Sequence, residues 1–381
     1  MPVVLAGRDP WRGAPVELTL AADRIAEVRD LPPGAVPDDE WLLPGLVDIQ
    51  VNGVAGIDLN AEDVTVEGVA AVVHHQQRAG VTRFCPTICT QSHERMVRGL
   101  QVVAAACRAH RVVDRAVAGI HVEGPFISPE DGPRGAHPRE HVRPLDWDEF
   151  VQFQRAADGR IKILTLSPEW PDAAAFIGEV VASGVVAAIG HTAASPEAIR
   201  NAVAAGARLS THLGNGAHAV LPRHPNYIWE QLGTDELSAS IIVDGHHLPP
   251  PVVKTFVRAK GIERTILISD AVALAGMPPG DYDWIGVKVT LSPAGRISLS
   301  GTPYLAGSAL DLASAIPRVI AYAGVGLADA VTMASVNPAR LLGMETGSLA
   351  PGARADLVVV RYALGADAVD VRRTVVAGET V

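Results

Sequence analysis

The stretch His121-Val122-Glu123-Gly124-Pro125 closes an apolar, β-branched run that starts at Ala116. This run predicts a buried strand over 116–122. Gly124 and Pro125 then end the strand and begin a loop. Glu123 therefore lies at the mouth of a buried strand, where a carboxylate needs a metal, a cation or several hydrogen bonds to offset its desolvation. The alternative is a Glu that caps a turn or pairs with a surface Arg.

Seven other apolar runs also end in polar residues, and helix-like segments separate most of them. The predicted strands are 45–52, 82–87, 116–122, 161–167, 185–190, 207–211, 239–243 and 265–269. The predicted helices include the Ala-rich amphipathic segments 68–78, 96–110, 173–183, 196–205 and 250–260. Strands alternating with helices favour parallel pairing, and eight units predict a (β/α)8 barrel. A doubly wound sheet would need a phosphate-binding fingerprint on an early turn, and we find no convincing one.

Both ends of the chain differ from this middle. Short alternating segments such as Val16–Leu20 and Arg24–Val28 predict strands, and the tail repeats the pattern. We therefore expect a small β-domain built from residues 1–43 and 345–381, around a barrel at 44–344.

Composition limits the class of protein. The chain has 381 residues, 48% of them hydrophobic and 19% charged, which is typical of a globular enzyme. Its net charge of −10 argues against a nucleic-acid partner. Three cysteines give no disulfide framework, and the sequence shows no signal peptide or membrane-length apolar run. We expect a cytoplasmic protein with a small-molecule substrate and no membrane partner.

In a (β/α)8 barrel the chemistry lies at the C-terminal ends of the strands. Nearly every predicted strand is followed there by a polar residue. These residues are Gln50, Asn52, Thr87, Glu123, Glu169, His191, His212, Asp244, His246, His247 and Asp270.

Glu123, His191 and His212 should meet at this mouth. Two imidazoles and one carboxylate with open positions are the ligand set of a catalytic zinc-type site. Asp270 follows the eighth strand, where a carboxylate can act as general base and then general acid. Taken singly, each His could be an ordinary core residue and Asp270 a turn cap.

The motifs together resemble those of the N-acetylglucosamine-6-phosphate deacetylases of the amidohydrolase superfamily. The resembling segments run in order from about residue 44 to 357. They are Pro44-Gly-Leu-Val-Asp-Ile-Gln-Val-Asn-Gly, His121-Val-Glu-Gly-Pro-Phe-Ile-Ser-Pro, Arg134-Gly-Ala-His-Pro, Gly190-His-Thr, Thr211-His-Leu, Asp244-Gly-His-His, Ile268-Ser-Asp-Ala and Gly347-Ser-Leu-Ala-Pro-Gly.

The resemblance implies a (β/α)8 TIM-like barrel with a small β-sandwich, and deacetylation of N-acetylglucosamine 6-phosphate, usually by a homodimer. It implies metal ligation by Glu123, His191 and His212, and acid/base catalysis by Asp270 with His137 supporting the oxyanion. Substrate-binding roles fall on Ala136, His137, Asn215, Gly216, Arg223 and His247, with Arg223 at the phosphate.

Gln50 and Asn52 stand where many amidohydrolases have His-x-His and a second metal. Amide side chains are weak ligands for a zinc-like ion. We therefore expect one divalent ion per chain, with Gln50 and Asn52 hydrogen-bonding to its surroundings. Zinc is the expected ion, and iron, manganese and cobalt are the alternatives.

Three segments depart from the family pattern. They are Leu213–His218, the Arg223-His224-Pro225 context, and an added Pro303-Tyr304 within 301–308. These changes leave open a different N-acyl sugar, or one without a phosphate. An amidohydrolase acting on another amide, and a catalytically silent sugar-phosphate sensor, are the further alternatives.

Overall fold

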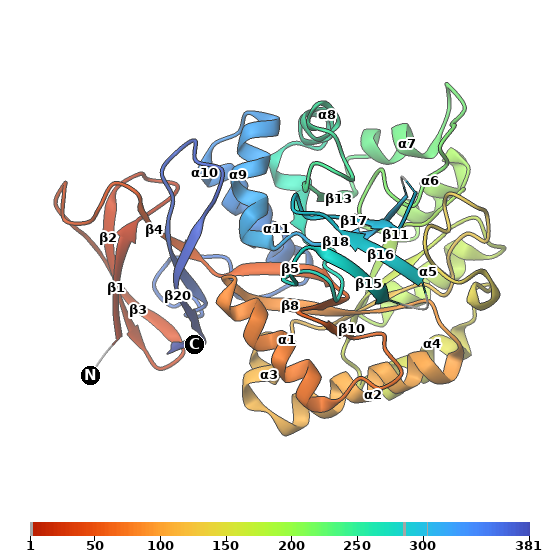
Figure 1. The fold of residues 1–381 in the computed structure, drawn as a ribbon, viewed down its shortest axis with the longest axis horizontal. Helices are drawn as coiled ribbons and strands as arrows, with labels where there is room; N and C mark the ends of the chain where they lie inside the picture. The colour runs from red at the N-terminus through yellow and green to blue at the C-terminus, as the bar shows by residue number, and fades with distance from the viewer. Residues whose placement is uncertain (1–2, 285–286, 303) are drawn as a thin grey trace.

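The computed structural model describes residues 3–284, 287–302 and 304–381, and its centre is a barrel of eight parallel strands (Figure 1). In chain order the strands are β5 (Leu46–Val51), β8 (Val81–Cys89), β9 (Ile120–Glu123), β10 (Ile161–Leu166), β11 (Val186–Ile189), β12 (Leu209–Ser210), β13 (Ser238–Ile242) and β14 (Thr265–Ile268). Asp270 N donates to Gln50 O (3.1 Å) and Asn52 N donates to Ala271 O (2.8 Å), which joins the first strand to the segment after the last. The predicted (β/α)8 barrel is confirmed.

Helices cover the outside of the barrel. They are α1 (Val66–Arg78), α2 (His93–Ala109), α3 (Arg111–Ala116), α4 (Trp147–Ala156), α5 (Ala173–Ala182), α6 (Pro196–Ala204), α7 (Tyr227–Gly233), α8 (Pro250–Lys260), α9 (Leu312–Ala323), α10 (Leu327–Val331) and α11 (Asn337–Leu341). Helix α1 illustrates the pattern, since Val69, Val72 and Val73 are buried and Thr65 caps its start. Within the described residues, no helix is both long and apolar enough to cross a bilayer.

The third predicted strand starts later than expected. Residues 111–116 form helix α3, and β9 begins only at Ile120. Helix α3 overlaps the predicted strand only at Ala116, which is buried together with Val113 on the core side of the helix, and residues 118–119 belong to no strand. Val117 still forms a parallel bridge to Phe84 beside the barrel.

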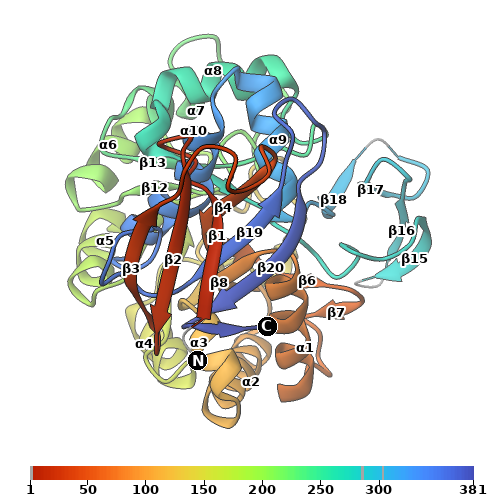
Figure 2. The ribbon, with the colours of Figure 1, turned by 90° about the vertical axis from the view of Figure 1, so that its left-hand side faces the viewer.

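Both termini contribute to a separate seven-stranded sheet, which faces the viewer in Figure 2. Its strands are β1 (Val3–Arg8), β2 (Pro15–Ala21), β3 (Arg24–Asp30), β4 (Glu40–Pro44), β19 (Leu357–Arg361), β20 (Asp370–Val376) and β21 (Glu379–Thr380). Leu18, Leu42 and Leu357 belong to a hydrophobic cluster distinct from the barrel core. The terminal β-unit is thus present, and its exact division from the barrel at residues 43/44 and 344/345 stays a prediction.

A four-stranded antiparallel sheet, which the sequence did not lead us to expect, follows the last barrel strand. It consists of β15 (Gly280–Trp284), β16 (Val287–Leu291), β17 (Arg296–Leu299) and β18 (Leu305–Ser308). Trp284 Nε1 donates to Asp58 Oδ2 (3.0 Å), next to the short hairpin of β6 (Gly53–Val54) and β7 (Ile57–Asp58). The unusual 301–308 segment lies here. Tyr304 is exposed, and Pro303 lies outside the described residues.

Candidate active site

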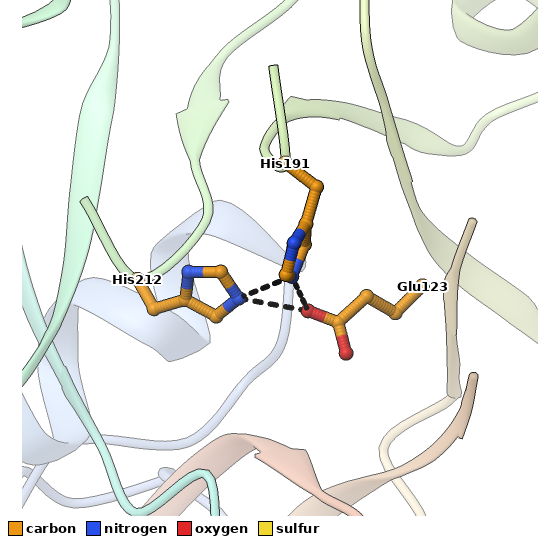
Figure 3. A group of neighbouring side chains, drawn as sticks. All are labelled: Glu123, His191 and His212. Atoms are coloured by element: carbon orange, nitrogen blue, oxygen red, sulfur yellow. Dashed lines mark hydrogen bonds and ion pairs between the residues drawn. The ribbon is translucent and has the colours of Figure 1, made fainter. Parts of the chain in front are cut away.

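Glu123, His191 and His212 converge at the C-terminal ends of three barrel strands (Figure 3). Glu123 ends β9, and the two histidines follow β11 and β12. Glu123 Oε1 lies 3.2 Å from His191 Nε2 and 2.8 Å from His212 Nε2, and the two nitrogens are 3.0 Å apart. All three side chains are buried. The structure therefore brings together the three residues expected to bind a metal.

The backbone at the site is strained. His191 (φ +49°), His212 (φ +29°) and Asp270 (φ +49°) adopt left-handed conformations that are uncommon for residues other than glycine. Each such residue costs about 1–3 kcal/mol, and such outliers gather at functional sites. The turn aims each side chain back across the strand ends. The residue types at these three positions did not predict this strain.

His191 is held in one orientation. Its Nδ1 donates to Pro133 O (2.9 Å), which leaves Nε2 as the free lone pair facing Glu123 and His212. Gly135 and Gly216 pack against the ring, and a Cβ at Gly216 would lie only 2.6 Å from His191 Nδ1. Gly216 is therefore needed for close packing on a ligand ring, a role that the sequence did not indicate.

The donor set fits a divalent ion. Three ligand atoms placed tetrahedrally at about 2.0–2.1 Å from zinc lie about 3.3 Å from one another. The observed separations of 2.8–3.2 Å are close to that arrangement. One carboxylate and two neutral imidazoles are also common ligands for zinc and similar ions. The cluster is thus compatible with a divalent metal, whose identity the geometry leaves open.

Gln50 and Asn52 lie beside this cluster and bond to it. Gln50 Nε2 donates to Glu123 Oε1 (2.9 Å), and Asn52 Nδ2 donates to Asp270 Oδ1 (2.8 Å). Cys89 completes a chain of contacts. Its Sγ lies 3.0 Å from Asn52 Oδ1 and 3.4 Å from Glu123 Oε2. Asp270 is thereby linked to the ligand cluster through neutral groups.

Charge around the cluster shifts several pKa values. Burial raises the pKa of Glu123, but the hydrogen bonds and charge that His191 and His212 supply in their protonated forms outweigh it and hold that pKa well below its usual range. Burial, and then the charge of Glu123, raise the pKa of Asp270 to about 6. A carboxylate whose pKa lies near neutrality can both accept and return a proton.

His137 reaches the same cluster from the loop after β9. Its Nε2 lies 3.3 Å from His191 Nε2 and 4.0 Å from Glu123 Oε2. Burial, with the nearby His191, lowers the pKa of His137 to about 3, so the neutral ring is favoured. Ala136, its neighbour, is exposed.

The other predicted substrate-binding residues differ in their exposure and in their hydrogen-bond partners. His247 Nδ1 is bonded to Asp244 Oδ2 (2.7 Å), whereas His246 Nε2 is bonded to Ala294 O (3.0 Å), in the turn between β16 and β17. Asn215 donates to His212 O (3.2 Å). Arg223 is exposed, and it makes no hydrogen bond or ion pair within the described part of the chain. The structure therefore does not bring Arg223 to the cluster.

Two strand-end residues serve the scaffold. Glu169 accepts hydrogen bonds from Ser128 Oγ, Ser167 Oγ and Ala193 N, each 2.7 Å long. Thr87 Oγ1 accepts from Val51 N (3.0 Å). Both residues join neighbouring segments of the barrel mouth, so a polar strand end alone does not identify a reacting group.

Comparisons with known proteins agree with this geometry. A family model described as "Amidohydrolase family" matches residues 41–381. The N-acetylglucosamine-6-phosphate deacetylase of Bacillus subtilis is 33% identical over 329 residues, which cover 85% of this chain and 81% of that protein. The N-acetylgalactosamine-6-phosphate deacetylase of Escherichia coli O157:H7 is 32% identical over 349 residues, 90% of each chain.

A solved structure extends the likeness over the whole chain. It is a mutant of the N-acetyl-D-glucosamine-6-phosphate deacetylase of Mycobacterium smegmatis in complex with N-acetyl-D-glucosamine-6-phosphate. It superposes with a TM-score of 0.87 at 31% identity, covering 100% of this chain and 99% of that one.

Proposed function

Because the chain belongs to the amidohydrolase family, among its N-acetylglucosamine-6-phosphate deacetylases, we propose that it hydrolyses N-acetylglucosamine 6-phosphate to glucosamine 6-phosphate and acetate. The observation that carries this proposal is the buried Glu123, His191 and His212 cluster, with Asp270 linked to it through Asn52. A pure binding protein has no need of such a carboxylate beside a metal cluster.

In this proposal Glu123, His191 and His212 hold the divalent ion. When bound, such an ion polarises the amide carbonyl and lowers the pKa of water. Asn52 engages Oδ1 of Asp270, which leaves Oδ2 to accept a proton from the attacking water. Asp270 then gives that proton to the amide nitrogen as the C–N bond breaks. The acyl carbon thereby leaves as acetate, and the sugar leaves as its amine.

His137 and His247 have the properties that the proposed substrate contacts require. Neutral His137 can donate an N–H to the carbonyl oxygen, where negative charge develops in the transition state. Asp244 fixes the ring of His247 through Nδ1, so its Nε2 is available to a sugar hydroxyl. We assign phosphate and sugar contacts also to Ala136, Asn215, Gly216 and Arg223, on the strength of the family motifs.

N-acetylgalactosamine 6-phosphate is the second candidate substrate. Two kinds of deacetylase, named for the gluco and the galacto sugar, are about equally similar to this chain. The two sugars differ only at C4, and the 213–218 segment departs from the family pattern. Identity alone therefore does not favour one epimer.

We further propose zinc as the bound ion, a homodimer as the assembly and the cytoplasm as the location. Two imidazoles and a carboxylate suit zinc, and iron, manganese or cobalt would also be accepted. The three cysteines, Cys85, Cys89 and Cys107, are free thiols, which suits a reducing compartment.

The test is acetate release from four sugars with one batch of protein. They are N-acetylglucosamine 6-phosphate, N-acetylgalactosamine 6-phosphate and the two unphosphorylated sugars. We expect the highest kcat/KM with N-acetylglucosamine 6-phosphate. Activity on neither phosphorylated sugar, with metal bound, would exclude this substrate class and leave the amidohydrolase class standing.

A further inference from the structure

A chain of buried hydrogen bonds crosses the barrel directly beneath the ligand cluster. His121 Nδ1 bonds to Ile49 O (3.0 Å), His121 Nε2 to Thr165 Oγ1 (2.7 Å), and Thr165 Oγ1 to Thr211 Oγ1 (2.7 Å). We call His121, Thr165 and Thr211 the polar belt. None of the three is more than 2% exposed. Polar groups so deep in an aliphatic barrel are costly unless each is paired, so their presence needs an explanation.

When His121 is neutral, the carbonyl oxygen of Ile49 determines the direction of every hydrogen bond in the polar belt. Ile49 O can only accept, so Nδ1 of His121 carries the proton and Nε2 accepts. The Thr165 hydroxyl must then donate to His121, and the Thr211 hydroxyl must donate to Thr165. Each belt hydrogen bond therefore has a single direction, and removal of one hydroxyl leaves a partner unpaired.

The belt residues adjoin the metal-binding residues in the sequence. Thr211 immediately precedes His212, and His121 lies two residues before Glu123 on the same strand. Thr165 is the register partner of Glu123 on the neighbouring strand. A shift of any belt residue would therefore move a ligand.

The third ligand is tied to the belt through Gly190, which immediately precedes His191. A Cβ at Gly190 would lie 2.7 Å from Thr165 Cγ2 and 2.8 Å from Thr211 Cβ. Gly190 therefore lets β11 pass between the two threonines while their hydroxyls stay in contact. The backbone in front of His191 is packed against both of them.

We propose that the polar belt of His121, Thr165 and Thr211 sets the mutual spacing of Glu123, His191 and His212, and so strengthens binding of the divalent ion. The three belt residues are positioning residues and touch neither ion nor substrate. The inference rests on the metal site of the proposed function but not on its substrate. Loss of groups that orient ligands typically weakens metal affinity 10- to 100-fold.

The test measures zinc affinity without substrate, by competition with a chromophoric chelator. Thr165→Val removes the hydroxyl at nearly constant shape, and Thr165→Ser keeps it. Thr82→Val is the matched control, because Thr82 is equally buried at the far end of β8 and bonds to Leu46 O (3.4 Å). The thermal midpoint of each metal-free variant is recorded alongside.

We expect Thr165→Val to weaken zinc binding about 10- to 100-fold, with Thr165→Ser and Thr82→Val near the parent. Parent-like affinity in Thr165→Val would overturn the proposal. So would an equal loss in Thr82→Val, because affinity would then only follow stability. If Thr165→Val does not fold, the zinc affinities of Thr211→Val and Thr211→Ser are compared instead. These variants test the same proposal and leave the Thr165–His121 hydrogen bond in place.

These outcomes are separable from failure of the proposed function. A belt effect on zinc affinity in a protein that deacetylates neither sugar phosphate would leave the inference standing and refute only the substrate. A parent protein that binds none of zinc, iron, manganese and cobalt would overturn both the belt's role and the metal site.

Discussion

Gln50 Nε2 donates a 2.9 Å hydrogen bond to Oε1 of Glu123, the oxygen that also faces His191 and His212. A cation is bound by atoms that offer a lone pair, whereas an amide N–H carries a partial positive charge and repels it. The position that could hold a second metal is therefore occupied by a donor that stabilises the carboxylate without adding charge.

From this contact we expect one metal equivalent per chain, measured by elemental analysis after dialysis against metal-free buffer. The double variant Gln50→His with Asn52→His replaces weak amide ligands with imidazoles and should raise the content towards two equivalents. Two equivalents in the parent protein would contradict the single-metal site.

Asp270→Asn should lower kcat about 100- to 10,000-fold while leaving metal content intact, because the amide cannot accept the proton. The exposed Asp283→Asn variant is the control. Steady-state kinetics and elemental analysis are made on the same preparations. An unchanged kcat in Asp270→Asn would refute the acid/base role.

Arg223→Ala tests the phosphate contact. If the guanidinium binds the phosphate, the variant should raise KM for the phosphorylated sugar at least about tenfold, a loss of about 1.4 kcal/mol. KM for the unphosphorylated sugar should not change. Arg258, exposed on α8, supplies the control Arg258→Ala. An equal KM for the phosphorylated sugar in all three proteins would remove Arg223 from the site.

The buried carboxyl group of Asp48 should make the stability of the folded protein depend on pH. It is fully buried on β5, and burial raises its pKa to about 7, although Gln50 N and Ser269 N donate to Oδ1 (3.2 and 3.3 Å). The folded state therefore holds this proton more tightly than the unfolded chain. The resulting stability is complete below the unfolded pKa of 3.8 and is lost as pH rises to about 7.

Asp48→Asn removes the ionisation, so the variant should gain stability relative to the parent on going from pH 5 to pH 8. Thermal midpoints at both pH values, with the exposed Asp63→Asn as control, provide the measurement. A difference between Asp48→Asn and parent that does not change with pH would show that Asp48 titrates normally.

The barrel and the ligand cluster could be predicted because they depend on local patterns. Each strand is an apolar run, and parallel strands must place their ends at one mouth, so Glu123, His191 and His212 had to be neighbours. The contact of Asn52 with Asp270 follows from the same rule, since the first and last strands of a barrel adjoin.

The rest depends on contacts that no local pattern encodes. Strand β9 begins at Ile120 and not at the predicted residue 116, because helix α3 continues to Ala116 and packs Val113 on the core. The inserted β15–β18 sheet, the position of Cys89 and the left-handed turns at His191 and His212 arise from tertiary packing. Arg223 was placed by motif alone, and the structure leaves it exposed on a loop.

The barrel closes between Gln50 and Asp270, that is, between its first strand and the segment after its last. The site is therefore complete only after the end of the barrel has been synthesised. The ligands Glu123, His191 and His212 all precede the eighth strand in the sequence, so they are synthesised before it. A nascent chain that ends before residue 265 contains the three ligands but has neither Asp270 nor the strand that closes the mouth. The proposed metal ligands are thus made before the proposed acid/base residue, and only the last strand brings the two together.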